Sequence, residues 1–328
     1  MQIVALKGGL GNQVFQYIFL RYLEETNETN CLADDSWFWI AHKELIKRRN
    51  GKPEINYSKT HNGYELEYVF PKIKKPILLS EYFDADTWAS IIHKRRGLDL
   101  KFKLGKIIRL LFLRSTNLPQ LFIDNGLGNL TFVAEHLSIN YEKGFKGKKI
   151  TVPNESFNPK LSLQKEAYFL GTWINSKYFE TYKEILIEEL AFRPISDEKN
   201  KQYEMAIQNC FSIGVHIRRG DYLLNAWDKP AEYYAAYINK IKSQKKDECR
   251  FFVFSDDMNW CKDNAKALGL PGGESTIFVE GNFDYKNNYI DIQLMAICKA
   301  LIVTPKSTFS FIASLLNQVE GFEVINHF

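Results

Sequence analysis

The 328-residue sequence lacks the patterns that mark a zinc site, a disulfide scaffold or a membrane span. Its five cysteines are scattered without a CxxC pair, and its six histidines form no HExxH motif. This spacing argues against a zinc site and indicates reduced thiols, as in cytosolic proteins. No run of 18 apolar residues occurs, and the chain opens directly on a strand pattern. We therefore expect a cytoplasmic protein with neither a membrane-spanning helix nor a signal peptide.

An excess of charge of either sign is also missing, since 43 Lys and Arg face 39 Asp and Glu for a net charge of +4. So mild a balance gives no support to nucleic-acid binding. Only residues 101–114, KFKLGKIIRLLFLR, combine five cations with a dense apolar face. A basic amphipathic helix of this kind packs on a protein core or lies on the inner surface of an anionic membrane, and the sequence leaves both open.

The first 35 residues read as the opening of a Rossmann-type unit. A short apolar strand over 2–6 leads into a glycine-rich turn over 7–13 and then a helix from Val14 to about Glu25. Residues 9–14, GLGNQV, nearly match a dinucleotide fingerprint, and Asp34 and Asp35 lie about where its ribose-binding acid would be. An NAD-dependent oxidoreductase is therefore one alternative for this chain.

The pattern from about 36 to 150 is too irregular to assign elements. Asp84 and Asp86 follow an apolar run there, and such a pair either binds a divalent metal or caps a helix. An aromatic-rich segment, 168–179, then leads into a helix that ends near residue 191. We place the domain boundary at residue 200.

After residue 210, strands and helices alternate strictly. Strands are predicted over 212–217, 250–255, 276–280, 300–304 and 323–326, with a helix in each of the four intervals between them. Alternating βα units form a parallel doubly wound sheet. We therefore predict an α/β fold with two Rossmann-like domains, residues 1–200 and 201–328.

The most informative stretch is VHIRRGDY, in which a buried strand stops at a polar turn. His216, Arg218, Arg219 and Asp221 lie at or just beyond its carboxyl end. Arginine binds phosphate or carboxylate bidentately and keeps its charge, and ligands of open α/β sheets bind beyond the carboxyl ends of strands. The turn is therefore predicted to bind an anion.

Four segments together resemble the bacterial α-1,2-fucosyltransferases of glycosyltransferase family 11. They run in order from residue 8 to residue 316: GGLGNQVFQY, HIRRGDY, FSDDMNWC and KSTFSFIASLL. The resemblance implies a GT-B fold, in which two Rossmann-like domains face a central cleft. It also implies inverting transfer from GDP-β-L-fucose, without metal or other cofactor. The implied acceptor is the 2-hydroxyl of a terminal galactoside in a surface glycan or its lipid-linked precursor.

The resemblance also assigns residue roles. Arg218 would bind the β-phosphate, while Arg219 either shares that role or holds the turn through Asp221. His216 would contact the nucleotide and Asp256 the guanosine end. The remaining donor contacts would come from Ser307, Thr308 and Phe309 before the last long helix, and from Gly9, Gly11 and Asn12 of the first domain.

The general base and the exact donor stay open at this stage. Asp221 is the nearest carboxylate, but two neighbouring arginines favour its charged form and make it a poor base, and the departing phosphate is the other acceptor for the proton. Another GDP-deoxyhexose would fit the same phosphate site. The further alternatives are a metal-dependent transferase that uses Asp84 and Asp86, and a sugar- or lipid-binding protein without turnover.

Overall fold

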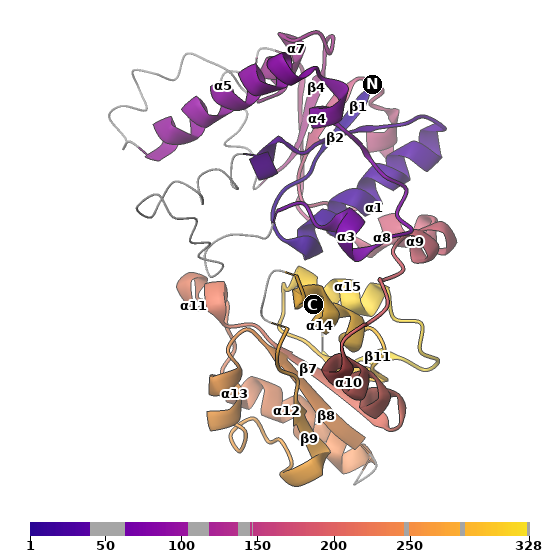
Figure 1. Cartoon of the computed structure of the whole chain (residues 1–328), viewed down its shortest axis with the longest axis vertical. Helices are drawn as coiled ribbons and strands as arrows, with labels where there is room; N and C mark the ends of the chain where they lie inside the picture. Colours follow the sequence, from indigo (N-terminus) through magenta and orange to yellow (C-terminus); the bar gives the residue numbers. More distant parts are fainter. Residues whose placement is uncertain are drawn as a thin grey trace. The chain divides into compact units, whose positions relative to one another are not determined.

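The computed structural model describes residues 1–39, 63–103, 118–136, 145, 147–245, 249–282 and 286–326. The chain divides into two compact units (Figure 1). The first extends to Glu189, and the second begins at Leu190 and also takes in Val69–Pro71. The second unit thus starts at Leu190, whereas the sequence suggested a start at residue 201.

The first unit contains a six-stranded, fully parallel sheet with the order β3-β2-β1-β6-β4-β5. Its strands are β1 (Gln2–Ala5), β2 (Leu32–Asp34), β3 (Ile77–Leu78), β4 (Thr131–Glu135), β5 (Lys149–Val152) and β6 (Ala167–Leu170). The central strands β1 and β6 are buried along their whole length, as expected where helices cover both faces of a parallel sheet.

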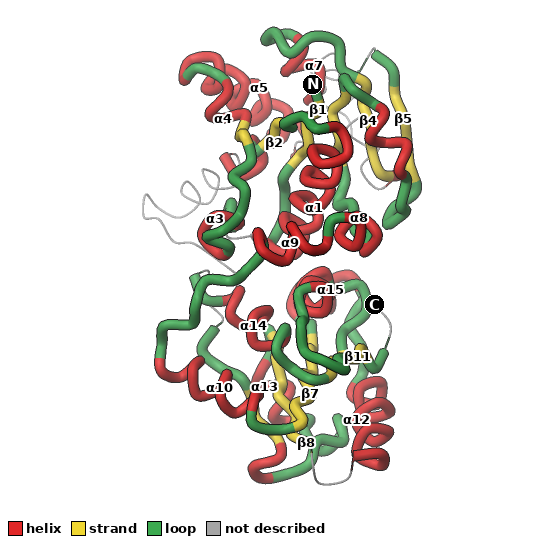
Figure 2. The backbone as a smooth tube through the Cα atoms, turned by 90° about the vertical axis from the view of Figure 1, so that its right-hand side faces the viewer, coloured by secondary structure: helices red, strands yellow, loops and turns green. Residues whose placement is uncertain are grey.

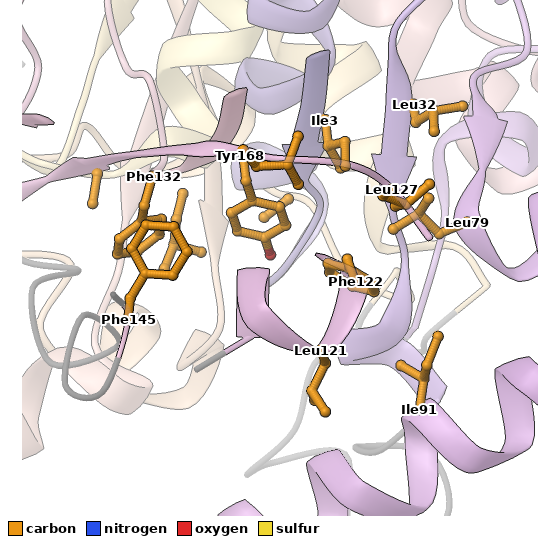
Figure 3. Close-up of a cluster of buried hydrophobic side chains, with 14 of the residues drawn as sticks. Ile3, Leu32, Leu79, Ile91, Leu121, Phe122, Leu127, Phe132, Phe145 and Tyr168 are labelled. Atoms are coloured by element: carbon orange, nitrogen blue, oxygen red, sulfur yellow. The ribbon is translucent and has the colours of Figure 1, made fainter. Parts of the chain in front are cut away.

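Helices cover this sheet and close its core. They are α1 (Leu10–Asn27), α3 (Leu66–Val69), α4 (Leu79–Tyr82), α5 (Ala85–Lys103), α7 (Leu118–Ile123), α8 (Ser176–Thr181) and α9 (Lys183–Glu189). Figure 3 shows Phe122 of α7 near Tyr168 of β6, and the two rings lie 5.7 Å apart. Another aromatic contact attaches α1, whose Phe19 stacks on Trp173 at 4.3 Å.

The first helix begins earlier than expected. It starts at Leu10, with Gly9 as its N-cap, so the predicted start at Val14 is wrong. Gly8 makes the short turn possible, because its φ of 83° is a conformation that side chains disfavour. Gly11 and Asn12 therefore lie in the first helical turn.

The second unit contains a five-stranded parallel sheet with the order β11-β10-β7-β8-β9. Its strands are β7 (Phe211–Ile217), β8 (Cys249–Ser255), β9 (Thr276–Phe278), β10 (Ala300–Ile302) and β11 (Glu323–Val324). All five lie at or within two residues of their predicted starts and ends. The α/β class with two Rossmann-like sheets, as in the GT-B type, is confirmed, and a cleft between the units stays a prediction.

Helices lie on both faces of this second sheet (Figure 2). They are α10 (Glu198–Gln208), α11 (Gly220–Asn225), α12 (Ala231–Lys245), α13 (Met258–Asp263), α14 (Asn288–Met295) and α15 (Thr308–Leu315). Side chains of α12 pack on the β7 face that carries Ile213, Val215 and Ile217. Since side chains alternate along a strand, Gly214 and His216 face the other side of the sheet.

The strand order of the second sheet defines where a ligand is expected. The chain runs from β7 through β8 to β9 on one side, and β10 and β11 then add on the other side of β7. The order therefore reverses between β7 and β10. Ligands of open α/β sheets bind beyond the carboxyl ends of the strands at such a reversal.

Candidate active site at the arginine turn

The arginine turn, Arg218–Asp221, follows β7 at this reversal and is held from both neighbouring strands. On the β10 side, the Arg218 N–H donates to Thr304 Oγ1 at 2.8 Å. On the β8 side, Asp256 accepts from the N–H of Arg219 at 2.8 Å and from that of Gly220 at 3.1 Å. A Cβ on Gly220 would lie 2.7 Å from the Asp256 carboxylate, so this close approach requires glycine.

The two arginines have different surroundings. Arg219 is 13% exposed, stacks on Trp260 with its guanidinium carbon 3.9 Å from the ring centroid, and pairs with Asp257 at 3.0 Å. Arg218 is 35% exposed and pairs with Asp221 at 2.8 Å and with Asp256 at 3.1 Å. The expectation that Arg219 holds the turn through Asp221 is wrong, because Arg218 makes that ion pair.

Both aspartates after β8 serve the local structure. Asp256 uses its two oxygens on the arginine turn, so the guanosine contact that the resemblance implied stays a prediction. Asp257 is the N-cap of α13 and accepts from the Trp260 N–H at 3.3 Å. The same residue holds Arg219. Through Asp256 the backbone of the turn is held from the β8 side, while the Arg218 side chain stays 35% exposed.

His216 is a buried residue of β7 that lies two residues before Arg218. The side chain is 4% exposed and stacks on Phe309, with ring centroids 5.7 Å apart. Its Nδ1 has no hydrogen-bond partner in the part of the chain that the structure describes. Burial, assisted by the charge of Arg218, lowers the pKa of His216 to about 3, so the ring is neutral. An unpaired buried nitrogen is costly, and a bound polar group would relieve that cost.

Ser307, Thr308 and Phe309 lie on the β10 side of the same reversal. Ser307 is the N-cap of α15, although its side chain makes no capping hydrogen bond. Thr308 opens the helix, whose free N–H groups favour an anion. The structure thus brings together His216, Arg218 and the start of α15, three of the features expected at the anion site.

The glycine-rich residues belong to the other sheet. Gly9, Gly11 and Asn12 form the start of α1 beyond the carboxyl end of β1. There the order of the first sheet also reverses, between β1 and β6. Their contact with a donor sugar stays a prediction.

Asp34 does not fit a dinucleotide site. Its side chain is buried, and its Oδ2 accepts from the Tyr168 hydroxyl at 2.7 Å. The other oxygen accepts from the Ser36 N–H at 2.9 Å. With both oxygens engaged inside the first unit, Asp34 is not available to a ribose. Asp35 is also buried and accepts from the Trp39 Nε1–H at 2.8 Å and the Ser80 N–H at 3.1 Å, so the oxidoreductase alternative loses both candidates for its ribose-binding acid.

Asp84 and Asp86 do not form a metal site in this structure. Asp84 accepts from the N–H groups of Asp86 at 3.1 Å and Thr87 at 3.0 Å and so caps α5. Among the described residues, no three His, Cys, Asp or Glu side chains gather as metal ligands would. All five cysteines are free thiols, as their spacing indicated.

The basic segment 101–114 falls for the most part outside the described residues, so its contact with a membrane surface stays a prediction. No helix in the described ranges is both long and apolar enough to span a bilayer.

Sequence reasoning missed Thr304. This fully buried residue lies directly beyond β10, and its hydroxyl meets the Arg218 N–H, the Tyr234 hydroxyl and the His216 carbonyl oxygen. A threonine at the end of an apolar run was the only signal, and it becomes meaningful once β10 is known to pair with β7.

Comparison with known proteins identifies a family and several similar proteins. The model of glycosyl transferase family 11 matches residues 134–328. The α-1,2-colitosyltransferase of Escherichia coli is 32% identical over 48% of this chain, a match that spans about half, 54%, of that relative. The O-antigen biosynthesis glycosyltransferase WbnK of Escherichia coli is 22% identical over 98% of this chain and 92% of its own length. Among solved structures, fucosyltransferase NodZ from Bradyrhizobium aligns with a TM-score of 0.48 and 12% identity, covering 96% of this chain and 92% of that chain.

Proposed function

The chain belongs to glycosyl transferase family 11, and we propose that it transfers L-fucose from GDP-β-L-fucose to the 2-hydroxyl of a terminal galactoside, with inversion. The observation that carries this proposal is Arg218, a partly exposed guanidinium at the strand-order reversal beside the start of α15. A diphosphate leaving group needs positive charge in place before the reaction. Arginine and free helix N–H groups contribute to that charge without a metal ion.

Each donor contact has a physical basis. Arg218 binds the β-phosphate with its planar fork, and the neutral His216 offers its buried Nδ1, which has no hydrogen-bond partner among the described residues. Arg219 keeps the turn in shape, because it is clamped by Asp257 and Trp260. Loss of the Arg218 guanidinium should therefore cost about 3 kcal/mol or more of transition-state stabilisation.

Asp221 has two roles that an experiment separates. The Asp221 carboxylate forms an ion pair with Arg218 and is itself 53% exposed, so the diphosphate has to compete with it for the Arg218 guanidinium. Asp221→Asn removes this competing charge and should tighten GDP binding. If Asp221 is also the general base, the same variant lowers kcat about 100-fold or more. If the departing phosphate takes the acceptor proton, kcat changes little.

A related donor is the second candidate. The α-1,2-colitosyltransferase is 32% identical over the matched region, and its name gives a different sugar with the same linkage. GDP-colitose would meet the same phosphate contacts as GDP-fucose. Parallel assays with the two donors decide between them through kcat/KM.

The acceptor belongs to a surface glycan or its lipid-linked precursor in this proposal, made at the cytoplasmic face of the membrane. The support is the resemblance to WbnK, whose name refers to O-antigen biosynthesis. Incubation with β-galactosides and analysis of the product linkage by NMR tests both the acceptor and the α-1,2 bond.

The central test is a thermal-shift screen followed by turnover. GDP should stabilise the protein, whereas UDP, CMP and NAD should not. Arg218→Ala should abolish transfer and keep its fold, and Arg250→Ala, at an exposed arginine of β8, is the matched control. Normal turnover by Arg218→Ala, or stabilisation by NAD alone, would contradict the proposal.

A further inference from the structure

The arginine turn has too little positive charge for a diphosphate. Its two arginines pair with four aspartates: Asp221 and Asp256 on Arg218, and Asp257 and Asp228 on Arg219. The cluster therefore carries a formal charge of −2 before any ligand arrives. A nucleoside diphosphate sugar adds about two further negative charges, which would be repelled at this distance unless another cation takes part.

Lys306 is the cation that the loop after β10 presents at this place. It lies between Thr304, which holds the Arg218 backbone, and Ser307, the N-cap of α15. Its side chain is exposed, and no carboxylate of the described residues pairs with its amine. In contrast to the two arginines, Lys306 has no carboxylate partner within the described ranges.

Contacts of its neighbours connect Lys306 to the segment that follows the arginine turn. The Lys306 Nζ lies 5.9 Å from the ring centroid of Trp227, which is 48% exposed. Trp227 in turn packs edge-on against Tyr222, with ring centroids 5.6 Å apart. The loops after β7 and β10 thus form one cluster, with Lys306 on the solvent side.

The backbone of Lys306 is also unusual. Its φ is 65°, in the left-handed region, where a lysine costs more than glycine or asparagine. Residues in such conformations concentrate at ligand sites, where the surrounding structure maintains them. Neither the charge nor the conformation of Lys306 is explained by a contact in the part of the chain that the structure describes.

We propose that Lys306 binds the diphosphate of the GDP-sugar donor and supplies the positive charge that the aspartates cancel at the arginine turn. This proposal rests on the proposed function. In the ligand-free protein the amine lies on Trp227, and in the donor complex it leaves that ring for a phosphate oxygen. Lys306 is then a substrate-binding residue on the opposite side of the strand-order reversal from Arg218.

Two substitutions separate charge from shape. Lys306→Asn removes the charge and places a residue that tolerates the left-handed backbone, so the melting temperature should not fall. Lys306→Arg keeps the charge. Lys266→Asn, at an exposed lysine in the turn after α13, is the matched control.

The measurement is calorimetric titration with GDP at low and high NaCl. Lys306→Asn should weaken GDP binding about tenfold, as for the loss of one charge-assisted hydrogen bond, and should flatten the salt dependence. Lys306→Arg and Lys266→Asn should stay within about threefold of the wild type.

The outcomes distinguish this inference from the proposed function. If the wild type binds no GDP, the proposed function fails and this assignment fails with it. If the wild type binds GDP and Lys306→Asn binds equally well, only the role of Lys306 is overturned. A loss of affinity that Lys306→Arg shares would also overturn it, because the effect would then depend on side-chain shape and not on charge.

Discussion

The buried hydroxyl of Thr304 connects the two sides of the candidate site, and its removal is the most direct test of how the arginine turn is held. Oγ1 accepts from the Arg218 N–H at 2.8 Å, donates to the His216 carbonyl oxygen at 3.0 Å and lies 2.8 Å from the Tyr234 hydroxyl. Thr304→Val keeps the shape and leaves all three groups without this partner. The two groups that are fully buried, the Tyr234 hydroxyl and the His216 carbonyl oxygen, cannot form a hydrogen bond with water instead.

The expected loss follows from these contacts. Each buried group left unpaired costs about 1–3 kcal/mol, so Thr304→Val should lower the free energy of unfolding by about 2–6 kcal/mol. Thr304→Ser keeps the hydroxyl and loses one methyl group, at about 1 kcal/mol. Urea denaturation of the two variants measures the difference.

The same pair of variants tests the connection to the site. Thr304→Val should weaken GDP binding more than Thr304→Ser, because the Arg218 backbone loses its anchor on β10. Equal stability and equal GDP affinity of the two variants would refute the reasoning, since the hydroxyl would then contribute nothing beyond its volume.

Further predictions concern pH and packing in the second unit. Burial keeps the pKa of His216 at about 3, so the contribution of this residue to the free energy of unfolding falls as the pH drops from about 6.5 toward 3. His216→Phe should remove this pH dependence, which amounts to at most about 1.4 kcal/mol per pH unit, and urea denaturation measures it. The pH dependence of stability that Asp291 contributes has the opposite sign. Burial raises the pKa of Asp291 to about 7, so the contribution of this residue to the free energy of unfolding falls as the pH rises from about 4 to 7. Compared with the wild type, Asp291→Asn should raise the melting temperature more at pH 8 than at pH 5. Gly214→Ala would place a Cβ 2.5 Å from Leu301 and should cost about 1–3 kcal/mol in unfolding free energy, whereas Gly272→Ala, with open space around it, should be nearly neutral.

The second sheet was predictable because its signals are local. Each of its longer strands, Phe211–Ile217 and Cys249–Ser255, is a mostly apolar segment that ends at polar turn residues. Buried parallel strands have this appearance whatever their neighbours are. The strands of the first unit are shorter, two to five residues each, and their register depends on distant partners such as Ala167 for Gln2. Short segments of that kind carry too little periodicity to be recognised one at a time.

The N-terminal region shows how a motif can mislead. GLGNQV resembles a dinucleotide fingerprint, and Asp34 has the right separation from it. The hydroxyl of Tyr168, far away in the sequence, binds Asp34 in the core and removes it from any ligand. Spacing along the chain cannot reveal a hydrogen bond between β2 and β6.

The sequence by itself determined that this protein is an α/β chain with an arginine-rich turn at the end of a buried strand, because hydrophobic runs and the chemistry of arginine are local properties. Only the tertiary structure decided which arginine is accessible. Trp260 of α13 and Asp257, the N-cap of that helix, contact Arg219 and leave it 13% exposed, while Arg218 is 35% exposed. The pairing of β7 with β10 likewise brought Thr304 and Lys306 to the turn. Which side chains converge at the end of a strand depends on its neighbours in the sheet, and a parallel sheet joins segments that are far apart in the chain.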